Sequence, residues 1–297
     1  MKRIVGMKFR KLLLATGGAA LVLGALAPVD EAAAAPTGIR NTRHNLGSGG
    51  LVGANQFGGT DEVCVFCHTP HGSNTTIAAP LWNKAAPTTA YTVYSTTNSS
   101  TMDAALANDG PIAGSTAIGS VSIACLSCHD GTQAMNNMIN QPGSGGYNPA
   151  GANMAGTWTP GTGPTPVLLT GILGAGIANL GTNLVNDHPI GIQYCGGGYT
   201  TASGTGTCGD GDFTAPQSAV ISGTRVFWVD TAAGAAGTRQ KTDMVLYNRT
   251  FVGGTTGPSV ECASCHDPHV DGTGGSGATF LRVANTQSAV CLACHVK

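Results

Sequence analysis

Hydrophobic residues are concentrated in a few segments of this 297-residue chain. Partial alternation of apolar and polar residues at 219–229 and at 244–252 is typical of half-buried strands, and it favours a hairpin within 219–252. The segment 167–180 is apolar but is interrupted by glycines, so we expect it to pack inside the protein and not to cross a membrane. One short helix is expected at 102–107, and the pattern predicts little further sheet.

Long stretches between these segments have the composition of loops. The ranges 95–120 and 143–166 are rich in Gly, Ser, Thr, Pro and Asn, which favour turns over regular structure. The chain has 45 glycines, and only 5% of its residues are aromatic. Charged residues make up 10%, which is too few for a disordered chain. Something other than large side chains must therefore supply part of the core.

The first 34 residues have the organisation of a secretory signal peptide. A basic start precedes an apolar run at 12–26 and small residues at 32–35, and we expect cleavage near Ala34, because Pro36 directly after the cut would be unfavourable. The apolar run is too short and too rich in Gly and Ala for a membrane span. There is no cysteine near the expected cleavage site, so the sequence does not indicate a lipid anchor. We therefore predict an exported protein without a membrane span. The basic positions are Lys2, Arg3, Lys8, Arg10 and Lys11.

Four copies of the pattern C-x-x-C-H carry the strongest chemical signal, at 64–68, 125–129, 262–266 and 291–295. This pattern attaches a c-type haem: the two thiols bond to the porphyrin, and the histidine binds the iron as its proximal ligand. We therefore predict four covalently bound haem c groups. The attachment cysteines are Cys64, Cys67, Cys125, Cys128, Cys262, Cys265, Cys291 and Cys294, and the proximal histidines are His68, His129, His266 and His295. Zinc and dithiol sites also use C-x-x-C pairs, but neither requires a histidine after every pair.

The remaining histidines match the number of distal iron positions. The chain has eight histidines, and those outside the motifs are His44, His71, His188 and His269. We predict that these four are the distal ligands, so that each iron is bound by two histidines. The alternative is that a methionine replaces one or two of them. The methionines after the leader are Met102, Met135, Met138, Met154 and Met244.

Two of the motifs continue as H-x-P-H, which places His71 three residues after His68 and His269 three residues after His266. Distal and proximal ligands must lie on opposite faces of the porphyrin. Residues three apart lie only about 5–6 Å apart, on one side, if helical. We therefore expect His71 and His269 each to reach a neighbouring haem, which places haems close together.

Two cysteines, Cys195 and Cys208, lie outside the haem motifs. In an oxidising compartment we expect them to form a disulfide, and two free thiols are the alternative.

The haems are expected to supply the core. The predicted fold class is mostly irregular and loop-rich, with short α-helices around a chain of haems and little β-structure. We expect one tetrahaem domain at 35–297. Its first two haems lie in 60–140, a Gly/Thr-rich middle with a distal histidine and the disulfide spans 141–257, and the last two haems lie in 258–297.

The charge balance does not suggest a nucleic-acid partner. The leader contains five of the 14 basic residues and two of the 15 acidic residues, which leaves nine basic against 13 acidic residues, a formal net charge of −4. Haem propionates would make the mature protein more negative.

Several segments resemble the doubled-CXXCH cytochromes of metal-reducing bacteria. They are CVFCHTPHG at 64–72, ACLSCHDGT at 124–132, NDHPIGI at 186–192, CASCHDPH at 262–269 and the segment 280–295 that ends in CLACH. The four motifs and His44 soon after the leader resemble the OmcE-type tetrahaem members, which polymerise into extracellular filaments. The resemblance implies a head-to-tail homopolymer in which His44 ligates a haem of the next subunit, at Cys291 and Cys294. The ranges 141–185 and 196–257 show no such likeness.

Three function classes compete on this basis. An extracellular polymer that passes electrons to outside acceptors is favoured, and a soluble periplasmic carrier that exchanges electrons with redox partner proteins is the alternative. A multihaem reductase is disfavoured, because eight histidines for eight axial positions leave no iron open to substrate. We therefore do not expect an enzyme.

Overall fold

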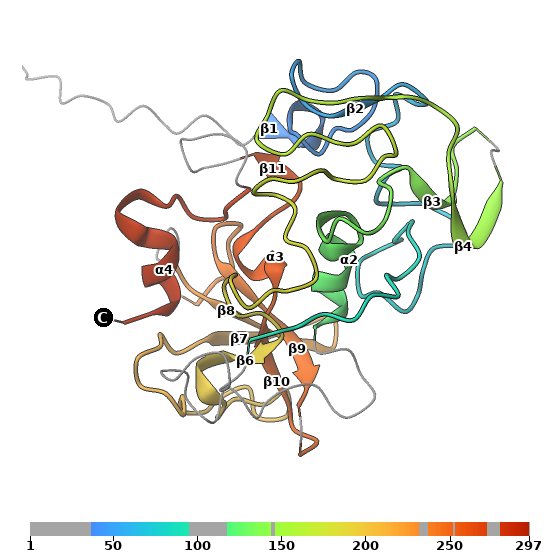
Figure 1. Cartoon of the computed structure of the whole chain (residues 1–297). Helices are drawn as coiled ribbons and strands as arrows, with labels where there is room; N and C mark the ends of the chain where they lie inside the picture. The colour runs from blue at the N-terminus through green and yellow to red at the C-terminus, as the bar shows by residue number, and fades with distance from the viewer. Residues whose placement is uncertain are drawn as a thin grey trace, which may run out of the picture. The chain divides into compact units, whose positions relative to one another are not determined.

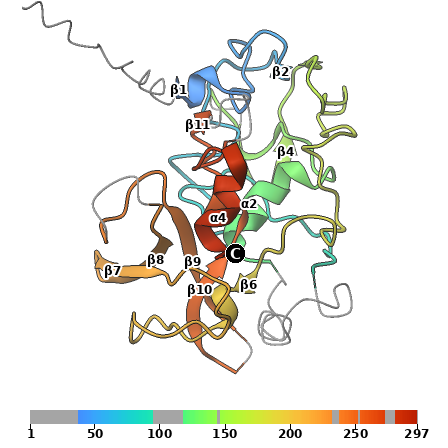
Figure 2. The same cartoon turned by 90° about the vertical axis from the view of Figure 1, so that its left-hand side faces the viewer.

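A five-stranded antiparallel sheet is the largest element of the computed structural model, which describes residues 37–94, 118–143, 146–231, 237–251, 253–271 and 280–296. Figures 1 and 2 show this sheet in the yellow-to-orange part of the chain. Its strands in spatial order are β6 (Ile192–Gln193), β10 (Thr256–Val260), β9 (Met244–Thr250), β8 (Thr224–Val229) and β7 (Gln217–Ile221).

A two-residue turn joins β7 to β8. Ile221 pairs with Thr224, and the intervening Ser222 and Gly223 have φ angles of 49° and 80°. Two successive positive φ angles are typical of a type I′ turn, whose twist matches that of the paired strands. The segment 219–229, expected as one strand, therefore contains the end of β7, the turn and the whole of β8.

The expectation of a loop-rich fold with short helices and little sheet is wrong. The pairing expected between 219–229 and 244–252 is present, with Phe227 opposite Leu246, but β6, β7 and β10 extend it to five strands. The sequence of β10, TGPSV, contains Gly and Pro, which argue against a strand, and pairing with β9 overrides that local preference. The buried side chains of β8 also give the sheet an apolar core of its own.

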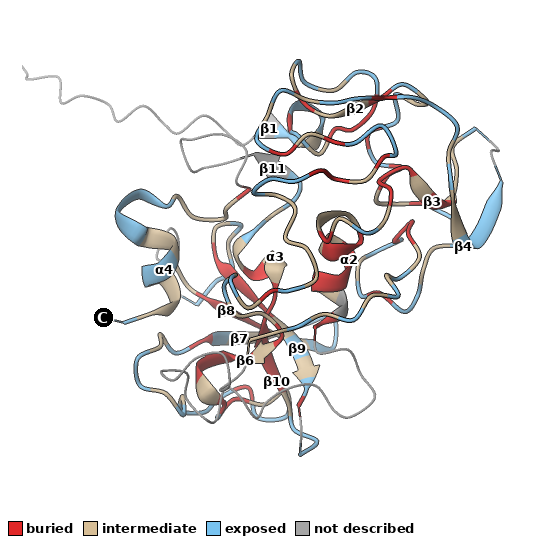
Figure 3. Ribbon diagram, viewed as in Figure 1, coloured by how far each residue is buried: buried red, intermediate tan, exposed pale blue. Residues whose placement is uncertain are grey.

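Three two-stranded antiparallel sheets accompany the large one. They pair β1 (Thr37–Gly38) with β11 (Val270–Asp271), β2 (Gln56–Phe57) with β5 (Trp158–Thr159), and β3 (Asn137–Asn140) with β4 (Tyr147–Asn153). The strand β4 is mostly exposed, whereas α2 and β8 are largely buried (Figure 3).

The three α-helices in the described part of the chain each carry one C-x-x-C pair, as expected for three of the four motifs. They are α2 (Ser120–His129), α3 (Cys262–Cys265) and α4 (Ala289–Cys294). The first motif forms a single tight turn instead, in which the amides of Cys67 and His68 both donate to the carbonyl of Cys64. Short 3₁₀ helices lie at η1 (Ile39–Asn41), η2 (Tyr194–Gly196) and η3 (Thr286–Ser288).

Three clusters of buried side chains form the interior. The first is built around the rings of Phe57, Phe66 and Trp158, with ring centres of Phe57 and Trp158 5.0 Å apart. The second lies on the large sheet and contains Tyr194 and Phe227. The third surrounds α2, whose apolar residues pack there with residues from 77 to 82 and with Leu184.

The segment 167–180 is only partly interior. Val167 and Leu173 are buried in the first cluster, whereas Leu169 and Ile177 are exposed. No helix among the described residues is long and apolar enough to cross a membrane. The expected signal peptide at 1–34 and the expected helix at 102–107 lie outside the described residues.

Candidate functional site

The four C-x-x-C sites are consecutive neighbours in the fold. Cys67 of the first site lies beside Cys128 of the second, and the thiol of Cys125 hydrogen bonds to that of Cys262 in the third. Cys265 of the third site lies beside Cys291 and Cys294 of the fourth. The order in space is therefore the order in the sequence. The helices α2, α3 and α4, which carry sites two to four, are labelled in Figure 1.

Burial raises the pKa of several of the motif thiols. Burial, followed by the neighbouring Cys128, raises the pKa of Cys67 to about 12. Burial, followed by Cys265, raises the pKa of Cys294 to about 11. The hydrogen bond to Cys262, followed by burial, raises the pKa of Cys125. Cys67 and Cys128 pack against the first apolar cluster, and Cys265 and Cys294 pack against the second, where a porphyrin edge could be attached.

Three motif histidines each face one of the remaining histidines. The ring centres are 6.1 Å apart for His129 and His44, 6.1 Å for His68 and His269, and 6.4 Å for His295 and His188. A metal–imidazole bond is about 2 Å long, so two imidazoles on opposite sides of one metal ion have ring centres about 6 Å apart. The observed spacings fit two axial ligands of one iron in each case.

Hydrogen bonds at Nδ1 orient five of these six rings. The Nδ1 atoms of His68 and His129 donate to the carbonyls of Pro80 and Ala178, at 2.6 and 2.7 Å. A carbonyl can only accept, so Nε2 carries the lone pair and is the atom available to a metal. Such bonds at the second nitrogen are typical of metal-ligating histidines. The corresponding contacts of the distal histidines join His44 to the Pro268 carbonyl at 3.1 Å, His188 to the Pro189 carbonyl at 2.9 Å, and His269 to the Asp267 carboxylate at 3.3 Å.

The ring pair of His44 and His129 is held in the neutral state. Burial, followed by the nearby His129, lowers the pKa of His44 to about 4. Burial also lowers the pKa of His129. Neutral imidazole is the form that binds a metal, so both rings are ready to ligate at neutral pH. Phe280 stacks on the His44 ring with centres 4.1 Å apart and further fixes it.

His71 and His266 complete the set of eight. Both residues are exposed. The His71 main chain is fixed, because its carbonyl accepts from Thr69 Oγ1 at 3.0 Å and from Asn140 Nδ2 at 3.2 Å. No aromatic ring of a described residue packs against the His71 imidazole. His71 and His266 are the two histidines outside the three ring pairs.

Within its own chain His44 lies at the second motif, whereas the resemblance implies that it reaches the site at Cys291 and Cys294 of a neighbouring subunit. His44 lies beside His129 of its own chain, and the ring beside His295 is His188. The family resemblance, together with the position of His44 soon after the leader, suggested that role. The contact between β1 and β11, which brings residues 37–38 against 270–271, holds this region against the body of its own chain.

Four of the five methionines considered as alternative ligands lie in the described part of the chain. Met135 and Met138 are buried in the first cluster with Met154 packed against it, and Met244 is buried in the second. Met102 lies outside the described residues. The paired imidazoles favour histidine over methionine at three sites.

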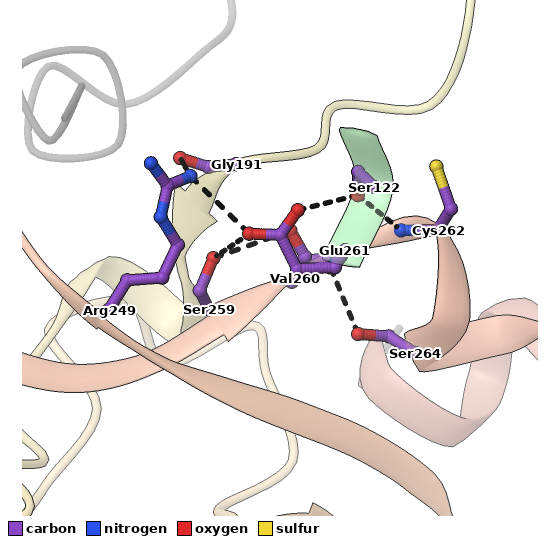
Figure 4. Close-up of polar contacts among 8 residues, drawn as sticks. All are labelled: Ser122, Gly191, Arg249, Ser259, Val260, Glu261, Cys262 and Ser264. Carbon is purple, nitrogen blue, oxygen red and sulfur yellow. Dashed lines mark hydrogen bonds and ion pairs between the residues drawn. The ribbon is translucent and has the colours of Figure 1, made fainter. Parts of the chain in front are cut away.

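A buried carboxylate joins the second and third sites, and Figure 4 shows its surroundings. Glu261, directly before the third motif, is 2% exposed. It accepts from Ser122 Oγ on α2 at 2.5 Å and pairs with Arg249 on β9 at 3.3 Å. Ser122 Oγ also accepts from the Cys262 amide at 3.0 Å. Burial raises the pKa of Glu261, against the lowering effects of Ser122 and Arg249.

A buried lysine lies at the first two sites. The side chain of Lys84 is 0% exposed, and its ammonium group donates to main-chain carbonyls at 134–137. Sequence reasoning missed both Lys84 and Glu261. The position of Glu261 next to a motif was a usable signal, whereas nothing in the local sequence around Lys84 distinguishes it.

Cys195 and Cys208 form a disulfide, with Cα atoms 5.2 Å apart. The bond lies in the second cluster, against which Cys265 and Cys294 also pack. The adjacent Tyr194 is fully buried and donates its hydroxyl to the Thr214 carbonyl at 2.8 Å. The disulfide therefore stabilises the apolar cluster against which the third and fourth sites pack.

Within the described ranges, no three or more His, Cys, Asp or Glu side chains converge as they would around a chelated metal ion. The imidazole rings lie in pairs instead. No protein-family model and no curated protein matches the chain.

Proposed function

We propose that this chain is an exported electron-transfer protein that binds four haem c groups, one at each C-x-x-C-H motif. The observation that carries the proposal is the set of three imidazole pairs at the spacing of two axial ligands, each containing one motif histidine. When bound, the haems supply reversible one-electron chemistry at iron.

The residues of the chain hold the groups and set their order. The motif cysteines attach them along a continuous line of neighbouring sites, which keeps successive redox centres close. The paired histidines would hold three of the haem irons from two sides and would leave no position there for a substrate. The role that we propose is therefore conduction of electrons.

We further propose that the protein polymerises head to tail as an extracellular filament. The exposed His71 supports this finer proposal, because a ligand on the surface can complete a site on a second copy. A contact of that kind joins two different surfaces, so it propagates unless it closes into a ring. The donor of the inter-subunit ligand is then His71, in place of His44. A soluble periplasmic carrier that exchanges electrons with partner proteins is the alternative.

Intact-mass spectrometry of the secreted protein tests the haem content. The mass should equal that of residues 35–297 plus four haems, and a Cys64→Ala/Cys67→Ala variant should lose one of the four. The oxidised spectrum should be low-spin, without a methionine–iron band. A haem-free native protein would refute the proposal.

Electron microscopy of culture supernatant separates the polymer from the carrier. Filaments that are lost in His71→Ala and kept in His44→Ala support the polymer with His71 as the link. A monomer at every concentration tested would favour the carrier.

A further inference from the structure

Lys84 is a buried cation without a carboxylate partner. Its Nζ atom lies 3.4 Å from the carbonyl of Ala134, 2.9 Å from that of Met135 and 2.8 Å from that of Asn137. An ammonium group has three donors and a neutral amine only two, so three acceptors around Nζ match the charged form. Among the described residues no Asp or Glu forms an ion pair with it.

The cation lies between the first two haem sites. The neighbouring Asn83 donates its amide to the Cys67 carbonyl at 2.8 Å and its side chain to the Val65 carbonyl at 2.7 Å, which ties residues 83–84 to the first motif. Met135, whose carbonyl binds Lys84, belongs to the cluster against which Cys67 and Cys128 both pack. The charge of Lys84 lowers the pKa of both thiols, although burial dominates each.

The carboxylate of Asp130 also lies near the second site, but it affects the pKa of the Cys128 thiol less than Lys84 does. The Asp130 carboxylate also accepts hydrogen bonds from the Tyr91 hydroxyl at 2.7 Å and from the Thr132 amide at 2.9 Å. The ammonium group of Lys84 is therefore a buried, fixed positive charge close to the first two sites.

We infer that Lys84 raises the reduction potentials of the haems at the first and second motifs. The inference rests on the proposed function. Addition of one electron to ferric iron gives ferrous iron and makes the site more negative by one charge, and no proton need be taken up. A fixed cation at low dielectric favours the electron-rich state. Isolated buried charges are costly to a fold, so a lysine in this place has a role beyond packing.

Redox titration of the haem-loaded protein tests this, with the four midpoints assigned to motifs by NMR of the haem methyl groups. Lys84→Gln keeps hydrogen-bond donors and removes the charge, so it should lower the midpoints of the first two motifs and leave the other two in place. Lys84→Arg keeps the charge and should hold them near the wild-type values. The matched control is Lys241→Gln, which removes the same charge at an exposed position and should move neither pair.

Unchanged midpoints at the first two motifs in Lys84→Gln would overturn the inference, as would an equal drop in Lys84→Arg, which would indicate packing. If neither variant accumulates, the wild-type protein provides the test. The midpoint potentials of the first two motifs should then average above those of the last two, and the reverse order would overturn the inference. A protein without haem would instead refute the proposed function, before any midpoint is measured.

Discussion

The imidazole rings of His68 and His269 have nearly parallel planes, inclined by 12°, with ring centres 6.1 Å apart. They come from two different H-x-P-H segments, so under the proposed function the distal histidine of one segment would serve the motif of the other. This relationship links the first and third haem sites through protein as well as through space.

Replacement of His269 by alanine should open the site at Cys64 and Cys67, and not the site of its own motif. Two nearly parallel imidazoles give a rhombic low-spin electron paramagnetic resonance signal, whereas the pairs inclined by 73° and 62° give strongly anisotropic ones. The oxidised wild type should therefore show a rhombic component. His269→Ala should lose it and gain a high-spin signal. Loss of an anisotropic component instead would contradict the pairing.

Replacement of His44 by alanine should open the second site within the same chain. The His44 ring faces His129, so the new high-spin haem should be the one attached at Cys125 and Cys128. The effect should be equally large in monomer and in any assembled form. His71→Ala is the matched comparison, because that residue is exposed. A high-spin haem at Cys291 and Cys294 in His44→Ala would restore the inter-subunit role first expected of His44.

Removal of the disulfide should destabilise the protein without changing its haems. Closure of a loop of this length contributes about 3 kcal/mol to the free energy of unfolding. Cys195→Ser/Cys208→Ser should therefore unfold at lower denaturant concentration, measured by tryptophan fluorescence, with an unchanged low-spin spectrum. In the wild type, thiol labelling after denaturation should find neither cysteine free. Labelling of both would refute the bond.

The buried Glu261 should make stability depend on pH. Its pKa in the folded protein is raised above 4.5, the value for an unburied glutamate. The folded state then binds the proton more tightly, so the stability contribution is present below that value and is lost as pH rises through the folded pKa. The unfolding free energy of wild type minus that of Glu261→Gln should fall with pH in this window, by at most about 1.4 kcal/mol per pH unit.

Chemical denaturation at a series of pH values measures this difference. Glu62→Gln controls for the loss of a carboxylate at an exposed position. A difference that grows with pH would mean that the charged form of Glu261 is the stabilising one, held by Arg249 and Ser122.

The ligand chemistry was accessible from the sequence because each motif is local. C-x-x-C-H places its three groups within five residues, and the H-x-P-H spacing predicts that His269 lies apart from the ligand site of His266; its ring lies near His68. The partner of each histidine depends on long-range contacts. His44 reaches His129 only because residues 37–38 pair with 270–271, a contact that no local pattern encodes.

The sheet was underestimated for a related reason. Alternation is visible in β8 and β9, whereas β6 is two residues long and β10 contains Gly257 and Pro258, so their pairing depends on neighbours already in place. Lys84 and Glu261 were not foreseen as functional either. Both side chains are buried beside motif residues, and the burial of a charged side chain cannot be predicted from its local sequence.

The arrangement of the four sites gives the proposed conductor one alternative route and one obligatory junction. The second site adjoins the first and the third, and the contact of His68 with His269 also joins the first site to the third. The fourth site adjoins the third. Loss of the second site would therefore leave a route open between the first and the third, whereas loss of the third site would isolate the fourth.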